Sequence, residues 1–337
     1  MLEEKLSGYV GSKYCVHVSS GLDALRLSLR SHGIGCGDRV LLPVHSYIAA
    51  WIPVLELGAI PVGITVDEGS LLLSFEELNR TDLTNISAIM PVHLYGQACD
   101  IDRIGELAEK YQIPIIEDAA QAHGAVINGK KIGSHNTSTC FSFYPTKNLG
   151  GIGEGGAIAT SNKDIYENIC SLRNYGKAGH GTGIYEYVSG NYRGDEIQAA
   201  FLIEKLKHLE RINAKRCRLL QTYRDNLSSV NKQSLALLNT DRNGAAHIAL
   251  VRTKERKIRD GLKRYLSRKG VDTIIHYPVA VSEQPCMKYQ KIEISDDARN
   301  QAIQISNTIL SLPLHEGLKT EEIDYISECI LDYIGNE

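Results

Sequence analysis

Residues 140–151 read Cys-Phe-Ser-Phe-Tyr-Pro-Thr-Lys-Asn-Leu-Gly-Gly and place a lysine, Lys147, directly after a predicted strand. The neighbours of this lysine are aromatic residues and glycines, which is an unusual setting for a solvated surface charge. A desolvated lysine loses its proton more easily and can then form a Schiff base with a carbonyl compound. Taken alone, the segment is also compatible with an ordinary surface lysine, so other segments must decide.

A second segment, residues 19–24, reads Ser-Ser-Gly-Leu-Asp-Ala; it follows one predicted strand and opens a predicted helix. The first backbone amides of a helix have no partner within the helix and lie at the positive end of its dipole. The segment therefore predicts a phosphate site. The simpler alternative is that Ser20 only caps the helix.

A third segment, residues 115–123, puts Glu117, Asp118 and His123 at the carboxyl end of a buried apolar strand. In open α/β sheets, ligands bind at this edge. A buried carboxylate there needs a cationic partner or hydrogen bonds to stay ionised. The alternatives are a metal pair with His93, although the spacing fits no standard metal motif, and helix capping by Asp118.

The three segments together match the needs of pyridoxal 5'-phosphate (PLP). This cofactor requires a phosphate site, a carboxylate for its ring nitrogen and a lysine that forms the Schiff base. The carboxylate keeps the ring nitrogen protonated, so that the ring accepts electrons from a broken Cα–H bond. The lysine first holds the cofactor and then moves the proton between carbon atoms. We therefore expect PLP as the cofactor and no metal.

The composition agrees with a soluble enzyme. The chain has 337 residues with a formal net charge of −3 and 43% hydrophobic residues, which excludes a disordered chain. The mild acidity argues against nucleic acid as a partner, and no apolar run is long enough for a membrane helix. The eight cysteines form no CxxC pair, and residues 1–5 do not begin a signal peptide, so we expect reduced thiols in a cytoplasmic protein.

Hydrophobic patterning predicts an α/β fold. Apolar runs at residues 15–18, 40–44, 60–66, 86–94, 113–117, 139–144 and 156–160 predict strands, with helical periodicity between several of them, as at 51–57 and 102–111. Such alternation is typical of parallel strands joined by helical crossovers. Later residues predict helices at 206–227, 258–269 and 298–310 and short strands at 246–252 and 273–276. We therefore expect a large domain at residues 1–205 and a smaller α+β domain at 206–337.

Five longer segments are familiar: residues 20–25 (Ser-Gly-Leu-Asp-Ala-Leu), 91–97 (Pro-Val-His-Leu-Tyr-Gly-Gln), 117–124 (Glu-Asp-Ala-Ala-Gln-Ala-His-Gly), 141–150 (Phe-Ser-Phe-Tyr-Pro-Thr-Lys-Asn-Leu-Gly) and 195–200 (Asp-Glu-Ile-Gln-Ala-Ala). Through them, residues 2–331 resemble the DegT/StrS family of PLP-dependent nucleotide-sugar aminotransferases. The resemblance implies fold type I: a mostly parallel seven-stranded sheet sandwiched by helices, plus the smaller C-terminal α+β domain.

The resemblance also implies roles for individual residues. Lys147 resembles the Schiff-base lysine, Asp118 the partner of the pyridinium nitrogen, and Gln121 the residue that bonds the 3-hydroxyl oxygen. Further positions resemble the phosphate ligands (Ser142 and the amides of Gly21 and Leu22), the aromatic residue stacked on the ring (Tyr47), the asparagine that reaches the neighbouring subunit's phosphate (Asn191), and residues near the substrate hexose (Tyr144, His276 and Tyr277). A homodimer with composite active sites is expected.

The residues at 21–25 and 47–49, Gly-Leu-Asp-Ala-Leu and Tyr-Ile-Ala, resemble the branch of the family that acts on 3-keto sugars. We therefore expect amination of a dTDP-linked 3-keto-6-deoxyhexose with glutamate as donor, in the biosynthesis of a lipopolysaccharide or antibiotic sugar. The alternatives are a 4-keto-6-deoxyhexose as substrate, and a PLP-binding family member with little or no turnover.

Three departures from the family pattern are present, and the altered asparagine loop and the missing front segment motivate the second alternative. The family run Asn-Ser-Arg-Leu-Asp is replaced by Asn-Tyr-Arg-Gly-Asp at 191–195, and a Pro-His pair is replaced by Val281-Ser282. Family members also carry a segment before the position of Leu2, and we expect this segment to be missing.

Overall fold

The central sheet forms from short buried strands in the computed structural model, which describes residues 1–135, 137–179, 183–231, 234–238 and 244–335. Its strands within the first 205 residues are β1 (Tyr14–Val18), β2 (Arg39–Pro43), β3 (Ile60–Ile64), β4 (Ala88–Ile89), β5 (Ile116–Asp118), β8 (Ser138–Ser142) and β9 (Gly156–Thr160). Two hydrogen-bonded groups, β1-β9-β8-β5 and β4-β2-β3, are joined by parallel bridges from Ile89 to Ile115 and from Val92 to Asp118. In the described residues, β9 runs antiparallel to both β1 and β8, whereas the other strand pairs of this sheet are parallel, so the predicted mostly parallel sheet is confirmed, with seven strands from the first 205 residues.

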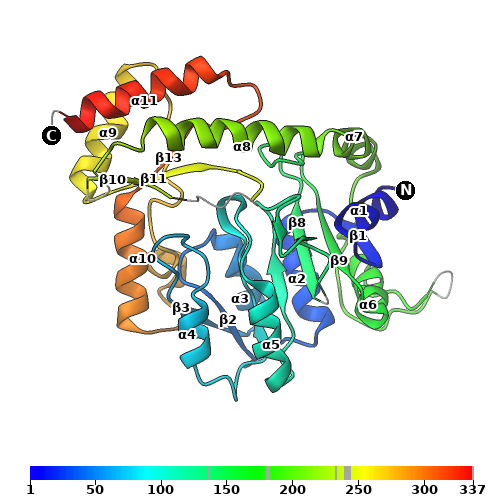
Figure 1. Ribbon diagram of the computed structural model, residues 1–337. Coiled ribbons are helices and arrows are strands. Elements are labelled where there is room, and N and C mark those ends of the chain that lie inside the picture. Colours follow the sequence, from blue (N-terminus) through cyan, green and yellow to red (C-terminus); the bar gives the residue numbers. More distant parts are fainter. Residues whose placement is uncertain (136, 180–182, 232–233, 239–243, 336–337) are drawn as a thin grey trace.

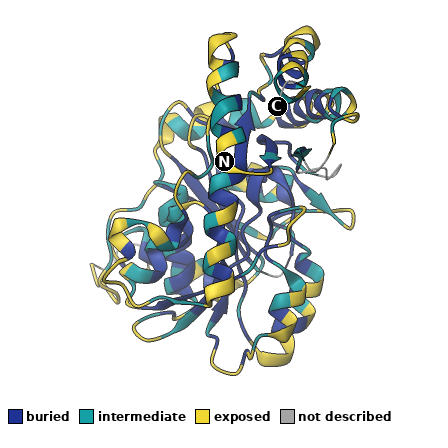
Figure 2. Ribbon diagram, turned by 90° about the vertical axis from the view of Figure 1, so that its left-hand side faces the viewer, coloured by how far each residue is buried: buried dark blue, intermediate teal, exposed yellow. Residues whose placement is uncertain are grey.

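Helices cover both faces of this sheet (Figure 1). In the first 205 residues they are α1 (Leu2–Val10), α2 (Gly21–Ser31), α3 (Ile52–Glu56), α4 (Phe75–Arg80), α5 (Ile101–Tyr111), α6 (Lys163–Arg173) and α7 (Glu196–Leu206). Alternate residues of β9 face opposite sides, because side chains on a strand alternate. Ile158 packs in the core that contains α2, whereas Ala157 and Ala159 pack in the core that contains α1 and α7. Figure 2 shows the resulting buried strands between helices with exposed outer surfaces.

The C-terminal part has its own antiparallel sheet of β10 (Leu235–Leu237), β11 (Ala249–Thr253) and β13 (Ile309–Leu312). A separate hydrophobic core packs this sheet against α8 (Leu209–Asn226), α9 (Arg256–Arg268) and α11 (Thr320–Gly335). The chain also returns to the central sheet, where β12 (Glu293–Ile294) pairs in parallel with β3 before α10 (Asp296–Thr308) begins. The expected boundary at residues 205 and 206 falls within the last turn of α7.

Several predicted elements differ from the structure in their bounds. The helix predicted at 206–227 corresponds to α8, which begins at Leu209 because α7 extends to Leu206, and the strand predicted at 86–94 is shorter, since β4 spans Ala88–Ile89. The helix predicted at 298–310 ends at Thr308, because Ile309 joins β13. The strand predicted at 273–276 is wrong: only Ile274 forms a bridge, to Ser311.

Side chains explain why residues 273–276 do not form a regular strand. The carbonyl of Thr273 accepts a hydrogen bond from the Lys263 ammonium at 2.6 Å, and the carbonyl of His276 accepts one from the Tyr95 hydroxyl at 2.6 Å. These carbonyls are therefore paired outside the sheet. In the described part of the chain, no helix has the length and apolarity needed to span a membrane.

Candidate active site

The carboxyl ends of the parallel strands bring the predicted residues to one edge of the central sheet. Asp118 is the last residue of β5 and Ser142 is the last residue of β8, its parallel neighbour. Residues 45–47 follow β2, and residues 93–97 follow β4. Parallel strands place such segments together because their carboxyl ends share an edge.

The start of α2 lies directly against the end of β8. A side chain on Gly21 would place its Cβ 2.6 Å from the Ser142 Cβ and 3.1 Å from the Ser142 Oγ. The Ser20 side chain caps the helix by accepting from the Asp23 amide at 3.0 Å, so the capping alternative is also realised. The amides of Gly21 and Leu22 are the first of the helix, and together with the Ser142 hydroxyl they make a set of donors suited to a phosphate.

Lys147 lies in a tight loop that follows β8. The loop closes through hydrogen bonds from the Lys147 amide to the Tyr144 carbonyl at 2.9 Å and from the Gly151 amide to the Phe143 carbonyl at 2.7 Å. Gly150 allows this closure, since a Cβ there would lie 2.3 Å from the Pro145 carbonyl oxygen. The loop thus holds Lys147 half-buried rather than extended into solvent.

Burial in the site makes Lys147 easier to deprotonate than a lysine in water. Burial lowers the pKa of Lys147 below its ordinary value of 10.5, and the charge of Asp118 opposes this change in part. Burial raises the pKa of Asp118, while the Ala120 amide and Lys147 counteract that rise. The pKa values of two histidines are also lowered by burial, to about 3 for His123 and about 4 for His276. These histidines are therefore neutral at neutral pH and supply no competing positive charge.

Gln121 is oriented by its neighbours. Its Oε1 accepts from the Tyr95 amide at 2.6 Å, and its Nε2 donates to the Tyr277 hydroxyl at 3.3 Å. The Tyr47 and Tyr277 rings lie 5.3 Å apart between centroids. Tyr47 is 55% exposed and Tyr144 is 46% exposed, so both rings lie on the open side of the site. The structure thus brings Tyr277 into contact with Gln121 and with Tyr47.

Asn191 lies on an exposed segment away from these contacts. Its Oδ1 accepts from the Arg193 amide at 3.4 Å, and its backbone pairs with Asn174 in an isolated bridge. Asn191 and Arg193 help to line a surface hollow of 390 Å³. The carbonyl of the next residue, Tyr192, accepts from the Ser19 amide at 3.0 Å, so this segment runs beside the residues that precede α2.

The metal alternative finds no support in the geometry. His93 donates from Nε2 to Glu117 at 2.8 Å, and its Nδ1 accepts from the Cys99 amide at 2.9 Å. Glu117 also accepts from the hydroxyls of Thr137 and Thr139. Both ring nitrogens and the carboxylate are therefore engaged in protein hydrogen bonds. Among the residues that the structure describes, no three or more potential ligands gather in a metal-binding group.

Sequence reasoning assigned no role to Tyr95 or to an adjacent buried network around Asn148. Asn148 donates to Asn213 at 2.8 Å and lies 2.9 Å from the Nδ1 of His247, so the residue after Lys147 is tied to α8 and to the C-terminal part. The signal in the sequence that could have found Tyr95 and Asn148 was their place in the familiar segments 91–97 and 141–150.

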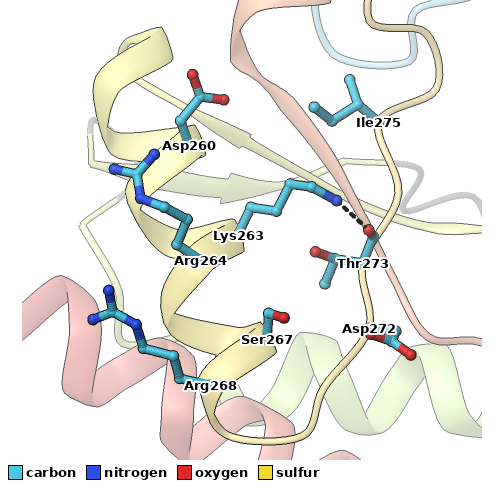
Figure 3. A pocket seen from close by; sticks show the side chains of 8 residues that line it. All are labelled: Asp260, Lys263, Arg264, Ser267, Arg268, Asp272, Thr273 and Ile275. Atoms are coloured by element: carbon cyan, nitrogen blue, oxygen red, sulfur yellow. Dashed lines mark hydrogen bonds between the residues drawn. The ribbon is translucent and has the colours of Figure 1, made fainter.

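A separate hollow of 540 Å³ lies between α9 and residues 272–275 (Figure 3). Its lining includes Lys263, whose ammonium group reaches across to the Thr273 carbonyl. This bond anchors the beginning of the segment that carries His276 and Tyr277. The hollow itself contains none of the predicted site residues.

The residues at the sheet edge fit PLP. The absence of a side chain at Gly21 lets the first turn of α2 lie close to Ser142, and the buried Asp118 lies in the field of Lys147. This donor set, with an acidic group and an amine at the same edge, corresponds to the three chemical needs of the cofactor.

Known proteins share this sequence and fold. The sequence profile of the DegT/DnrJ/EryC1/StrS aminotransferase family matches residues 1–331. The chain is 36% identical to dTDP-3-amino-3,4,6-trideoxy-alpha-D-glucose transaminase of Streptomyces venezuelae, covering 98% of this chain and 86% of that protein. It is also 36% identical to dTDP-3-amino-3,6-dideoxy-alpha-D-galactopyranose transaminase of Aneurinibacillus thermoaerophilus, covering 98% and 88%. The crystal structure of S. venezuelae DesV in complex with a ketimine intermediate superposes with a TM-score of 0.93 at 36% identity, over 99% of this chain and 88% of that chain.

Proposed function

Because the chain belongs to the DegT/DnrJ/EryC1/StrS aminotransferase family, we propose that it transfers an amino group from glutamate to a nucleotide-linked 3-keto-6-deoxyhexose. The observation that carries this proposal is that Lys147 and Asp118 are close enough for the charge of each to counteract the effect of burial on the other's pKa, at the same sheet edge as Ser142 and the start of α2 at Gly21. A cofactor of this family, PLP, supplies an electron sink for the bond broken at the substrate carbon.

The residues of this chain have distinct tasks in the proposed reaction. Lys147 holds the cofactor and later carries a proton between carbon atoms, and its lowered pKa favours the neutral amine that both tasks require. Asp118 pairs with the protonated ring nitrogen, which compensates the cost of burying this carboxylate. Ser142 and the Gly21 and Leu22 amides bind the phosphate, and the Gln121 amide bonds the ring oxygen.

The substrate is assigned through the open side of the site. In our proposal, four side chains line this open side. Tyr47 stacks on the cofactor ring, and the other three lie near the hexose: Tyr144, His276 and Tyr277. Support for a 3-keto sugar comes from the relatives described above, whose names carry the amino group at carbon 3. The dTDP group is proposed on the same ground. We place the enzyme in the cytoplasm, where the eight free cysteines would stay reduced.

We further propose that the active enzyme is a homodimer. On α7, Leu202 is buried within the chain, whereas Ile197 is 70% and Phe201 is 40% exposed. An exposed apolar helix face of this kind is suited to burial against a second copy. Asn191 lines the same surface hollow as Ile197 at the start of α7, and in such a dimer it would reach the phosphate of the partner. A Phe201→Asp variant should sediment as a monomer; an unchanged dimer would place the interface elsewhere.

One spectroscopic experiment tests the proposed function. The purified protein with PLP should be yellow, lose this absorbance when glutamate is added, and regain it with a dTDP-linked 3-keto-6-deoxyhexose. If glutamate leaves the spectrum unchanged while PLP is bound, the transaminase proposal fails and a PLP-binding role without turnover gains support. The 4-keto isomer, offered in parallel, decides the regiochemistry: faster recovery with that isomer would overturn the 3-keto assignment.

A further inference from the structure

Tyr95 occupies the centre of a closed ring of contacts between three segments. Its amide donates to the Gln121 Oε1 at 2.6 Å, and the Gln121 Nε2 donates to the Tyr277 hydroxyl at 3.3 Å. The residue before Tyr277 is His276, whose carbonyl accepts the Tyr95 hydroxyl at 2.6 Å. The ring therefore connects the residue proposed to bond the cofactor with the pair proposed to face the sugar.

The hydroxyl of Tyr95 is fixed from both sides. A carbonyl oxygen only accepts, so the Tyr95 proton points to His276, and the hydroxyl oxygen must accept from the Nε2–H of His45 at 2.6 Å. His45 follows β2 and directly precedes Ser46 and Tyr47. Tyr95 and His45 are both buried, 0% and 3% exposed, so water does not replace these bonds.

The backbone of Tyr95 is held independently of its hydroxyl. Its amide is bound to Gln121, and its carbonyl accepts from the His247 amide at 3.1 Å. Gly96 is in the left-handed region, and its Cα approaches the His247 backbone so closely that a Cβ would lie 2.6 Å from the His247 nitrogen. Removing the hydroxyl alone should therefore leave the turn and the Gln121 contact in place.

We propose that the Tyr95 hydroxyl is a positioning group for the keto-sugar half-reaction: it sets the place of His276 and Tyr277, while the Tyr95 amide separately orients Gln121. Other contacts also hold this segment: Lys263 binds the Thr273 carbonyl, Ser311 pairs with Ile274 and lies 2.8 Å from the His276 Nδ1, and Gln121 binds the Tyr277 hydroxyl. Among the backbone anchors, the bond from Tyr95 to the His276 carbonyl is the nearest to Tyr277. This inference rests on the proposed transaminase function.

The test is the Tyr95→Phe variant of the PLP-loaded enzyme, with each half-reaction measured alone. We expect the yellow absorbance and the rate of its loss with glutamate to stay within about twofold of the wild type. The concentration of dTDP-linked 3-keto-6-deoxyhexose that gives half-maximal recovery should rise about tenfold, the usual effect of losing one buried hydrogen bond. Equal losses in both half-reactions, or an unchanged sugar dependence, would overturn the proposal.

Tyr223→Phe provides a matched control. Tyr223 is also fully buried and donates its hydroxyl to a backbone carbonyl, that of Pro313, at 3.1 Å, but it lies in the C-terminal core. Its loss should lower thermal stability about as much as the Tyr95 change and leave the sugar dependence unaltered. If the control raises the half-saturating sugar concentration equally, the effect is one of general stability and the proposal fails.

A second variant keeps the proposal testable if Tyr95→Phe does not fold. His45→Leu removes the donor that orients the Tyr95 hydroxyl, and it should raise the half-saturating sugar concentration about threefold without changing the glutamate rate. No change would contradict the role of the hydroxyl. Failure of the wild type to react with glutamate is a different result, since it removes the proposed function itself.

Discussion

Gly21→Ala is the most direct test of the proposed phosphate site, which consists of the Gly21 and Leu22 amides and the Ser142 hydroxyl. Gly21 does not adopt a left-handed conformation, and it is the first residue of α2, so alanine is acceptable to its own backbone. The new Cβ would lie 2.6 Å from the Ser142 Cβ and 3.2 Å from the Ser142 Cα. Carbon atoms normally approach to about 3.5 Å, so α2 and β8 must separate by about 1 Å. A side-chain rotation of Ser142 cannot relieve this clash, because its Cα is also too close.

This displacement sets the expected losses in folding stability and in PLP affinity. Overpacking of this kind costs about 1–3 kcal/mol of folding stability. A shift of about 1 Å also breaks at least one charge-assisted hydrogen bond to the phosphate, which contributes about 1.5–3 kcal/mol. The dissociation constant for PLP should therefore increase about 10- to 100-fold.

The assay is a titration of the apo-protein with PLP, followed by its yellow absorbance, together with urea unfolding of the same samples. Gly105→Ala is the control: Gly105 lies inside α5, and a Cβ added there would have no atom within 4 Å, so this variant should gain up to about 1 kcal/mol and bind PLP normally. If Gly21→Ala binds PLP with wild-type affinity, the assignment of the phosphate site to the start of α2 is refuted.

Three further predictions concern the charged groups. Lys147→Ala should fold with the stability of the wild-type apo-protein but show neither yellow colour nor turnover; surviving turnover would contradict the lysine assignment. The rate at which the apo-protein becomes yellow with PLP should rise with pH, and its midpoint should lie below 10.5 because burial lowers the pKa of Lys147. Asp118→Asn should lower this midpoint further, because it removes a negative charge that raises the pKa of Lys147. A midpoint at or above 10.5 in stopped-flow measurements would argue against a buried lysine. Glu117→Gln should lose about 2–4 kcal/mol at neutral pH, since it disrupts a buried hydrogen-bonded pair. The pKa of Glu117 is lowered in the folded protein, so its contribution is complete above the ordinary value of 4.5 and is lost as the pH falls through the folded value; a difference in urea stability that does not shrink at acidic pH would contradict this account.

Local patterns were sufficient to predict the fold and the central chemistry. Alternating apolar runs predicted the parallel sheet, and the order of segments predicted the family, which the match over residues 1–331 confirms. Because parallel strands end at one edge, Asp118 was expected at the ligand-binding edge from its place after an apolar run, whereas Ser142 was expected there only from the family resemblance. Lys147 was predicted from its aromatic and glycine neighbours, and Gly21 from its place at a helix start.

Other features depended on contacts between distant parts of the chain. The strand predicted at 273–276 failed because Lys263 and Tyr95 take two of its carbonyls, and no local pattern encodes such a contact. The return of β12 to the central sheet was missed for the same reason.

By itself, then, the sequence determined which residue types stand at the ends of which strands, and hence the sheet, the family and the candidate cofactor site. The tertiary structure alone decided how those residues are oriented and charged. Desolvation, which lowers the pKa of Lys147, requires the packing of the whole site around it. The orientation of Gln121 toward Tyr277 requires Tyr95, a residue 26 positions away in the chain, to be brought within hydrogen-bonding distance by folding.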